Sequence, residues 1–107
     1  MQEISTYHPD DAVNVAGHLH TILYEDEKLR VLKVSVAPGD TAKIHWHPRN
    51  INYVVSGGEL EFTSKDGERK VVTLTSGQVT SAKNEMYHAV NNIGDKTVET
   101  IQVELKT

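Results

Sequence analysis

Three histidines in this sequence have the type and spacing of metal ligands. His45 and His47 stand one residue apart in the segment IHWHP, and His88 follows much later in the chain. Side chains alternate between the two faces of a β-strand, so His45 and His47 project from one face while Trp46 projects from the other. The pair therefore presents two neighbouring imidazoles on one side of a strand.

A sheet that closes on itself would bring His88 to this pair. His88 shares a predicted strand face with Met86 and Val90. Three neutral imidazoles inside an apolar barrel leave acceptor nitrogens unsatisfied, at a cost of about 1–3 kcal/mol for each buried group. A divalent metal ion would satisfy all three and leave positions open for water, dioxygen or a bidentate substrate. The alternative is a barrel that holds three satisfied polar residues and no metal.

The composition limits the classes of protein to consider. There is no cysteine, so a metal must be held by nitrogen and oxygen, and thiolate chemistry is excluded. Eleven basic and fifteen acidic side chains give a net charge of −4 without a Lys/Arg cluster, which argues against a nucleic-acid partner. The sequence has no signal-peptide pattern and no apolar run of the ~20 residues that a bilayer span requires, which predicts a cytoplasmic protein.

Strand-like alternation recurs along the chain between turn-forming residues, at a spacing of roughly 8–12 residues. The whole chain, 1–107, is predicted to be one all-β domain of about eight strands. Pro38-Gly39 and Asp66-Gly67 predict two of the turns. No long segment has a helical period, so we expect at most a short helical turn near the N-terminus, around PDDAVNVAG.

With these residues in place, the chain resembles a small single-domain cupin from about Thr21 to Leu105. The first cupin motif runs Gly, five residues, His, one, His, three or four, Glu, six, Gly, and Gly39, His45 and His47 match it. The second runs Gly, five, Pro, one, Gly, two, His, three, Asn. Three positions of this second motif match, and Lys83 and Glu85 replace the proline and the second glycine; the matching residues are Gly77, His88 and Asn92. The resemblance implies a double-stranded β-helix, the jelly-roll barrel of this family.

The sequence departs from the cupin pattern at the acidic ligand. Counting from the flanking motif residues puts that position on Asn50, Ile51 or Asn52, none of which is a carboxylate. By resemblance, cupins with three histidines and no glutamate include iron-dependent dioxygenases that act on thiols or diketones. The implied ligands are His45, His47 and His88, and an Asn50 or Asn52 amide would be a weak fourth ligand or would bind a water or the substrate. Iron(II) is the favoured metal, with zinc, nickel or manganese as alternatives.

Other candidate residues have weaker signals. His18 and His20 repeat the His-x-His spacing without the family's surrounding glycine, so they are expected at the surface or at a sheet edge. Arg49 could pair with a substrate carboxylate at the barrel mouth, or it is a solvated turn residue. Trp46 is expected to pack under the sheet or in a dimer contact. The remaining candidates for the substrate pocket are Tyr53, Phe62 and Met86.

These observations favour a mononuclear metal-dependent enzyme, dioxygenase-like, that acts on a small organic acid, thiol or diketone. Two alternatives stay open: a non-enzymatic module that binds or senses a small ligand, and a metal-assisted isomerase or lyase. A homodimer is expected because a small two-sheet barrel leaves strand edges exposed.

Overall fold

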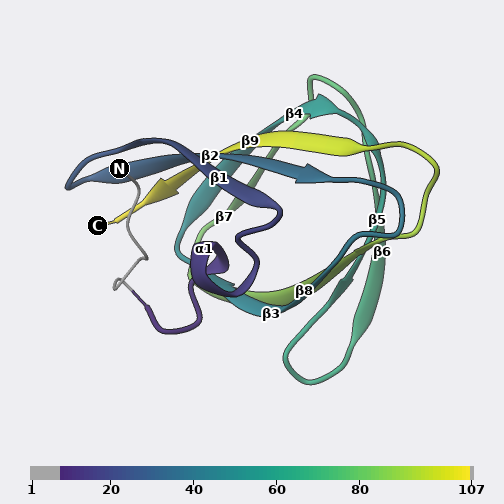
Figure 1. Ribbon diagram of the computed structural model, residues 1–107, viewed down its shortest axis with the longest axis horizontal. Helices are drawn as coiled ribbons and strands as arrows, with labels where there is room; N and C mark the ends of the chain where they lie inside the picture. The colour runs from purple at the N-terminus through teal and green to yellow at the C-terminus, as the bar shows by residue number, and fades with distance from the viewer. Residues whose placement is uncertain (1–7, 107) are drawn as a thin grey trace.

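The computed structural model describes residues 8–106, which form two antiparallel sheets facing each other. Within these residues the first sheet has the strand order β1 (His20–Glu25), β2 (Leu29–Val36), β9 (Val98–Leu105), β4 (Asn50–Ser56) and β7 (Val79–Ala82). The second has the order β3 (Thr41–His47), β8 (Met86–Asn92), β5 (Gly58–Thr63) and β6 (Arg69–Leu74). Figure 1 shows β2, β9 and β4 on one side of the molecule and β3 and β8 on the other. The all-β prediction is confirmed.

Two of the turns between strands have the predicted chemistry. Gly39 has a φ of 84° and Gly67 a φ of 91°, both in the left-handed region that glycine adopts without a steric penalty. The amide of Asp40 donates to the carbonyl of Ala37 at 2.9 Å, which closes the turn around Pro38-Gly39. This turn leads directly into β3, the strand that carries His45 and His47.

The short helix α1 (Ala12–Val15) lies in the predicted helical segment and begins at a capping residue. The Asp11 carboxylate accepts a hydrogen bond from the Val13 amide at 3.0 Å, as an N-cap side chain does. Among the described residues, no helix is both long and apolar enough to cross a bilayer.

The segment before α1 packs against the outer side of β3 and covers Trp46. The Trp46 amide donates to the Asp10 carbonyl at 2.6 Å, and the His8 ring stacks on the indole with centroids 4.3 Å apart. The indole N–H donates to a Glu85 carboxylate oxygen at 3.1 Å. Trp46 is consequently 5% exposed and packs within its own chain, which favours the first of the two roles expected for it.

An apolar core fills one part of the space between the sheets. Its buried members come from both sheets and from the segment around α1: Ala16, Leu19, Val36, Ala42, Leu60, Val90 and Val98. Burying a valine or leucine side chain of this kind stabilises the fold by roughly 1.5–3 kcal/mol. The core supports the barrel from one end, and the polar residues of the interior gather at the other.

Candidate metal centre

Strand β3 places His45 and His47 on the inner face of the barrel, as the alternation predicts. His45 is 0% exposed and His47 is 2% exposed. In the ladder between β3 and β8, His45 pairs directly with His88, and a bulge between Ala42 and His45 adjusts the register. The two strands therefore bring the predicted triad to one place.

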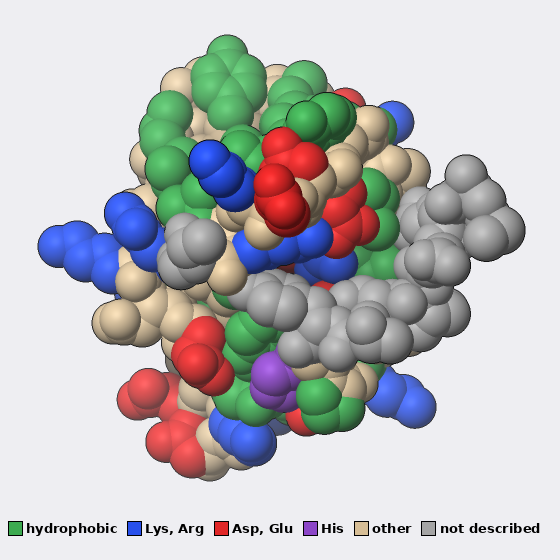
Figure 2. Space-filling view, turned by 90° about the vertical axis from the view of Figure 1, so that its left-hand side faces the viewer, with side chains coloured by type: hydrophobic (Ala, Val, Ile, Leu, Met, Phe, Trp, Pro, Cys, Tyr) green, Lys and Arg blue, Asp and Glu red, His purple; other side chains and the backbone are tan. Residues whose placement is uncertain are grey.

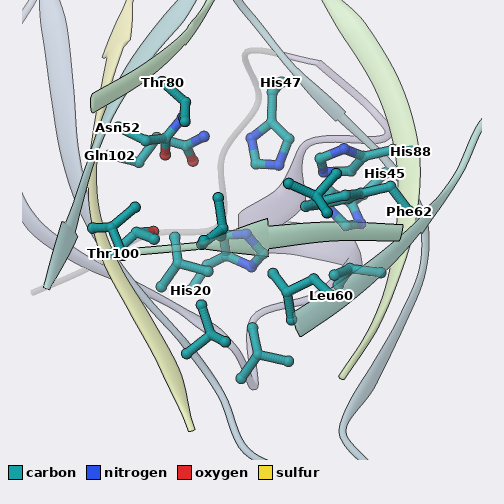
Figure 3. Close-up of a pocket in the computed structure, with 17 residues that line it drawn as sticks. His20, His45, His47, Asn52, Leu60, Phe62, Thr80, His88, Thr100 and Gln102 are labelled. Carbon is teal, nitrogen blue, oxygen red and sulfur yellow. The ribbon is translucent and has the colours of Figure 1, made fainter. Parts of the chain in front are cut away.

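The imidazole rings of the triad are in mutual contact (Figure 3). The ring centroid of His45 lies 4.9 Å from that of His47 and 4.9 Å from that of His88, and the His47 and His88 centroids are 5.1 Å apart. Phe62 stacks on the other side of His88 at 4.9 Å. The clustering that the sequence predicted for these three rings is present.

A fourth imidazole joins the cluster from the opposite sheet. His20 begins β1, is 4% exposed, and has its ring centroid 5.4 Å from those of both His45 and His47. One ligand nitrogen from each of these three residues lies within 4.8 Å of the other two. The surface position predicted for His20 is wrong because the residue is buried, although its strand β1 does lie at the edge of the five-stranded sheet. His18 is exposed and hydrogen-bonds the Thr41 carbonyl.

Hydrogen bonds at Nδ1 fix the tautomers of three of these rings. Nδ1 of His20 donates to the Ala16 carbonyl at 2.8 Å, and Nδ1 of His45 donates to the Lys43 carbonyl at 2.6 Å. Nδ1 of His47 donates to a Glu104 carboxylate oxygen at 2.7 Å. A ring that donates through Nδ1 keeps a lone pair on Nε2, so all three rings offer Nε2 as the ligand atom.

The donor set fits a divalent metal ion. Nε2 of His45 is buried and has no hydrogen-bond partner in the structure, an arrangement that costs about 1–3 kcal/mol unless something fills it. Two nitrogens bound to one ion at about 2.1 Å lie at most about 4.2 Å apart. The observed separations of up to 4.8 Å among His20, His45 and His47 require small ring rotations to reach that geometry.

All four imidazoles are held in the neutral form that binds metals. Burial lowers the pKa of His20 and of His47 to about 3, and that of His88 to about 2, and the neighbouring imidazoles contribute to each shift. Burial also lowers the pKa of His45. At neutral pH the site therefore presents lone pairs rather than positive charges.

A buried group of charged residues lies next to His47 and holds its ring in place through a hydrogen bond. Glu104, which orients His47, also accepts hydrogen bonds from Nε and a terminal nitrogen of Arg30. The same terminal nitrogen donates to the Asp11 carboxylate at 2.8 Å, and all three charged residues are at most 1% exposed. Burial raises the pKa of Glu104 although Arg30 acts in the opposite direction. A carboxylate that orients a metal-binding histidine is a recurrent second-sphere arrangement.

The sequence did not predict this charged group. Glu104 lies on a strand whose apolar residues alternate with it and so indicate that the opposite face is the buried one. These residues are Ile101, Val103 and Leu105. In the ladder, Arg30 pairs directly with Glu104. The sequence does show that Thr100, Gln102 and Glu104 share one face of the strand. Only knowledge of the strand pairing could have shown that this face lies in the interior.

The imidazoles line a cavity of about 200 Å³ between the sheets (Figure 3). Its apolar walls come from both sheets and include Val36, Val54, Leu60, Phe62 and Val90. Its polar walls are the four histidines and a group formed by Asn52, Thr80, Thr100 and Gln102. Several of these residues also line a wider opening toward Met86 and Tyr87. The cavity is smaller than the about 300–1,000 Å³ of typical ligand pockets, which suits a small molecule.

The remaining predicted pocket residues occupy different places. Phe62 and Asn52 line the cavity, whereas Met86 lines its opening. Asn50 is 2% exposed and also borders the opening, with its amide nitrogen bonded to the Pro48 carbonyl at 2.8 Å. The structure does not bring the other two to the cavity: Arg49 is exposed, and Tyr53 is 51% exposed on the outer face of β4.

Comparison with known proteins identifies the family and the fold of the chain. A family model described as the cupin domain matches residues 32–104, which cover most of the chain and include all three predicted ligands. The chain therefore belongs to the cupin family. The double-stranded β-helix that the motifs implied is confirmed by this match and by the solved structures below.

A cupin domain protein from Bordetella pertussis superposes with a TM-score of 0.75 at 21% identity, over 82% of this chain and 92% of that one. The DMSP lyase DddQ from Ruegeria pomeroyi superposes with a TM-score of 0.59 at 19% identity, over 80% and 45%. At these identities the likeness shows the fold alone. Among curated proteins, oxalate decarboxylase OxdC from Bacillus subtilis is 30% identical over 73 residues, which are 65% of this chain and 19% of that protein.

Proposed function

We propose that the chain is a metal-binding cupin in which His20, His45, His47 and His88 hold one divalent first-row metal ion. The observation that carries this proposal is the convergence of the buried ligand nitrogens of His20, His45 and His47, with Nε2 of His45 left without a partner. His88 is included because its ring contacts those of His45 and His47. Iron(II) is the favoured ion, and zinc, nickel and manganese are the alternatives, because ligand type alone does not select among them.

In this proposal His20 replaces the acidic ligand that the cupin pattern has and this chain lacks. The amide of Asn50, which stands near the missing carboxylate in sequence, has its oxygen and nitrogen occupied by Asn52 and Pro48. His20 comes instead from β1 on the opposite sheet and has its ring 5.4 Å from those of His45 and His47. The resulting ligand set carries no negative charge, so an anionic substrate would supply the charge balance.

We propose further that the centre belongs to a metal-dependent enzyme that acts on a small organic acid, thiol or diketone. A metal ion at this site would polarise the substrate or activate dioxygen. The chain's own residues would exclude bulk water with the apolar walls and orient the substrate with Asn52, Thr80 and Gln102. The Glu104 carboxylate would keep His47 in the tautomer that binds metal.

Two alternatives follow from specific observations. Among the described residues that line the cavity there is no carboxylate to act as a base, which favours a module that binds a small ligand without turning it over. The sequence likeness to an oxalate decarboxylase and the shared fold with a DMSP lyase favour a reaction that consumes no dioxygen, such as a decarboxylation or an elimination.

Metal binding is tested by titrating the chelator-treated protein with Co²⁺ and following its visible absorption. One ion per chain is expected. His47→Ala should weaken binding by more than the about 10–100-fold that second-sphere changes cause, and His20→Ala should have a similar effect. His18→Ala, in an exposed histidine two residues away, is the matched control and should leave the affinity unchanged. Stoichiometric tight binding in His47→Ala would refute the site.

The reaction class is tested with the metal-loaded protein and a panel of small acids, thiols and diketones. Oxygen consumption that depends on the substrate would identify a dioxygenase. Product formation under anaerobic conditions would identify a lyase or decarboxylase. Binding of a panel member without turnover in either atmosphere would favour the ligand-binding module.

We also propose that a second copy of the chain covers the outer face of the five-stranded sheet. Figure 2 shows hydrophobic side chains gathered at the top of the molecule, on the side where Figure 1 places β2, β9 and β4. The exposed residues of this face include Leu23, Ile51, Tyr53 and Val79, which are 42–62% exposed. A contiguous apolar surface is typical of an interface, and a two-fold dimer uses the same surface twice.

A further inference from the structure

A row of uncharged polar side chains crosses three strands on the inner face of the larger sheet. Gln102 on β9 pairs with Asn52 on β4, and Asn52 pairs with Thr80 on β7. Directly paired residues of neighbouring strands point to the same face, and all three line the cavity. Figure 3 shows them together on the side of the cavity away from His45, His88 and Phe62. We refer to Asn52, Thr80 and Gln102 as the amide row.

The hydrogen bonds around the row fix which atoms of Asn52 remain available. The side-chain nitrogen of Asn52 donates to Oδ1 of Asn50 at 2.8 Å, and the side-chain nitrogen of Asn50 donates to the Pro48 carbonyl at 2.8 Å. A carbonyl oxygen can only accept, so this relay sets the orientation of both amides. Asn52 therefore uses one N–H of its amide within the protein and keeps its side-chain oxygen as an acceptor for a ligand.

Gln102 adds a second acceptor that has no partner. Its side chain is 6% exposed, and its Oε1 is buried without a hydrogen bond. Leaving such an atom unsatisfied costs about 1–3 kcal/mol, which a ligand that donates to it would recover. A buried unpartnered acceptor beside a second acceptor is a site for a hydrogen-bond donor.

The charged side chains in and near the cavity lining further limit the class of ligand that the cavity can bind. The described residues around the cavity include neither lysine nor arginine, and Lys70, which lines the wider opening beside the row, is accompanied there by Glu68. Inside the cavity only a bound metal ion could therefore balance a carboxylate. A second carboxylate at the far end of a substrate would lose its hydration beside the acceptor oxygens of Asn52 and Gln102, with only neutral donors in exchange.

We propose that the amide row recognises a hydroxyl or amino group on the substrate, at the end opposite the metal-binding end. This inference rests on the proposed metal centre, which would hold the substrate's acidic end. It assigns Gln102, Asn52 and Thr80 as specificity residues and selects against dicarboxylates. The substrate class is a small acid with a short apolar body and a terminal hydrogen-bond donor.

The test compares three small acids that differ at one end. Protein loaded with Co²⁺ is titrated calorimetrically with 3-hydroxypropanoate, butanoate and succinate, which carry a hydroxyl, a methyl and a carboxylate group on the same two-carbon chain. We expect 3-hydroxypropanoate to bind about tenfold more tightly than butanoate, as one buried hydrogen bond implies. Succinate should bind most weakly of the three.

Variants of the row connect that preference to its residues. Gln102→Met keeps the length of the side chain and removes the acceptor, so the preference for the hydroxyl over the methyl should fall from about tenfold to about twofold or less. Thr80→Val makes a smaller change in the same direction and serves if Gln102→Met does not fold. Thr73→Val, at an exposed threonine on β6, is the matched control and should keep the wild-type preference.

Each outcome bears on one proposal. Equal or tighter binding of succinate or butanoate by the cobalt-loaded protein overturns the role of the amide row, and so does binding of none of the three. An unchanged hydroxyl preference in both Gln102→Met and Thr80→Val overturns it as well. A failure to take up Co²⁺ is seen in the absorption spectrum before any acid is added, and it overturns the metal centre instead.

Discussion

The inner face of the five-stranded sheet has an apolar part and a polar part. The apolar part includes Val36, Val54 and Val98, which are buried as in a usual soluble protein.

The arrangement is reversed in the polar part of this sheet. Along β9, Thr100, Gln102 and Glu104 lie on the inner face, whereas Ile101, Val103 and Leu105 lie on the outer face. Along β4, Asn50 and Asn52 face inward, and Ile51 and Tyr53 face outward. This part of the sheet directs polar residues toward the cavity and apolar residues toward the surface.

The apolar and the polar parts of the interior have different roles, one in stability and one in function. The apolar core at one end of the barrel stabilises the fold, while the polar inner face must find a partner for every buried group. Asp11, Arg30, Glu104 and His47 are joined by hydrogen bonds, although one terminal nitrogen of Arg30 has no partner. Nε2 of His45 and Oε1 of Gln102 also have no partner, and these two atoms lie where a metal ion and a substrate would bind.

The largest expected effect on stability comes from removing the buried positive charge of Arg30. Arg30→Met would leave the carboxylates of Asp11 and Glu104 buried without their cation, so the free energy of unfolding should fall by about 3–5 kcal/mol. Lys33→Met, on the same strand but facing outward, should change it by less than about 0.5 kcal/mol. Urea unfolding curves measure both, and comparable losses would contradict the contrast between the faces.

A smaller effect is expected from the carboxylate that orients His47. Glu104→Gln should weaken metal binding by about 10–100-fold, which is roughly 1.4–2.7 kcal/mol. Glu99→Gln lies on the outer side of the same strand, pairs with Lys33 at 3.8 Å, and is the matched control. Metal titration of the two variants separates them. An unchanged metal affinity in Glu104→Gln would show that His47 keeps its orientation without this hydrogen bond.

The metal-free protein should lose stability as the pH falls below about 6.5. The folded-state pKa values of His20 and His47 are about 3 and that of His88 is about 2, so below pH 6.5 the unfolded chain binds more protons than the folded one. The loss approaches about 1.4 kcal/mol per pH unit for each histidine. The raised pKa of Glu104 acts in the opposite sense but is a single group. Urea midpoints that stay constant from pH 7 to 5 would contradict this coupling.

The smallest effect on stability, and a clear effect on assembly, is expected on the outer face. Ile51→Glu should convert the proposed dimer into a monomer in sedimentation experiments while changing the stability of the subunit by less than about 0.5 kcal/mol. Val71→Glu is the control because Val71 is 53% exposed on the other sheet. If the wild-type protein sediments as a monomer, the proposed interface is refuted.

Most of the fold could be predicted from local pattern. Alternating strands, turn residues such as Pro38-Gly39, and the spacing of His45, His47 and His88 led to an all-β cupin barrel. These signals are local, or they repeat at fixed distances along the chain. The helix α1 lies in the N-terminal segment where at most a short helical turn was expected, because no long segment of the sequence has a helical period.

Part of the site could not be predicted because it depends on contacts across the barrel. His20 belongs to a His-x-His pair that lacks the family spacing, and its inward position follows from its pairing with Val34, which also lines the cavity. The partnership of Arg30 with Asp11 and Glu104 joins three distant segments. Alternation alone shows that a strand has two faces, but the pairing with neighbouring strands decides which face is inside.

The position of Trp46 gives the protein a built-in optical reporter. It is the only tryptophan in the sequence, and it stands between His45 and His47 on the strand while facing the N-terminal segment. A paramagnetic ion at the imidazoles would quench its fluorescence because the indole is on the residue between two of the proposed ligands, and loss of the stacked His8 would shift its emission. Occupancy of the interior and docking of the outer segment can thus be followed as two signals from a single indole.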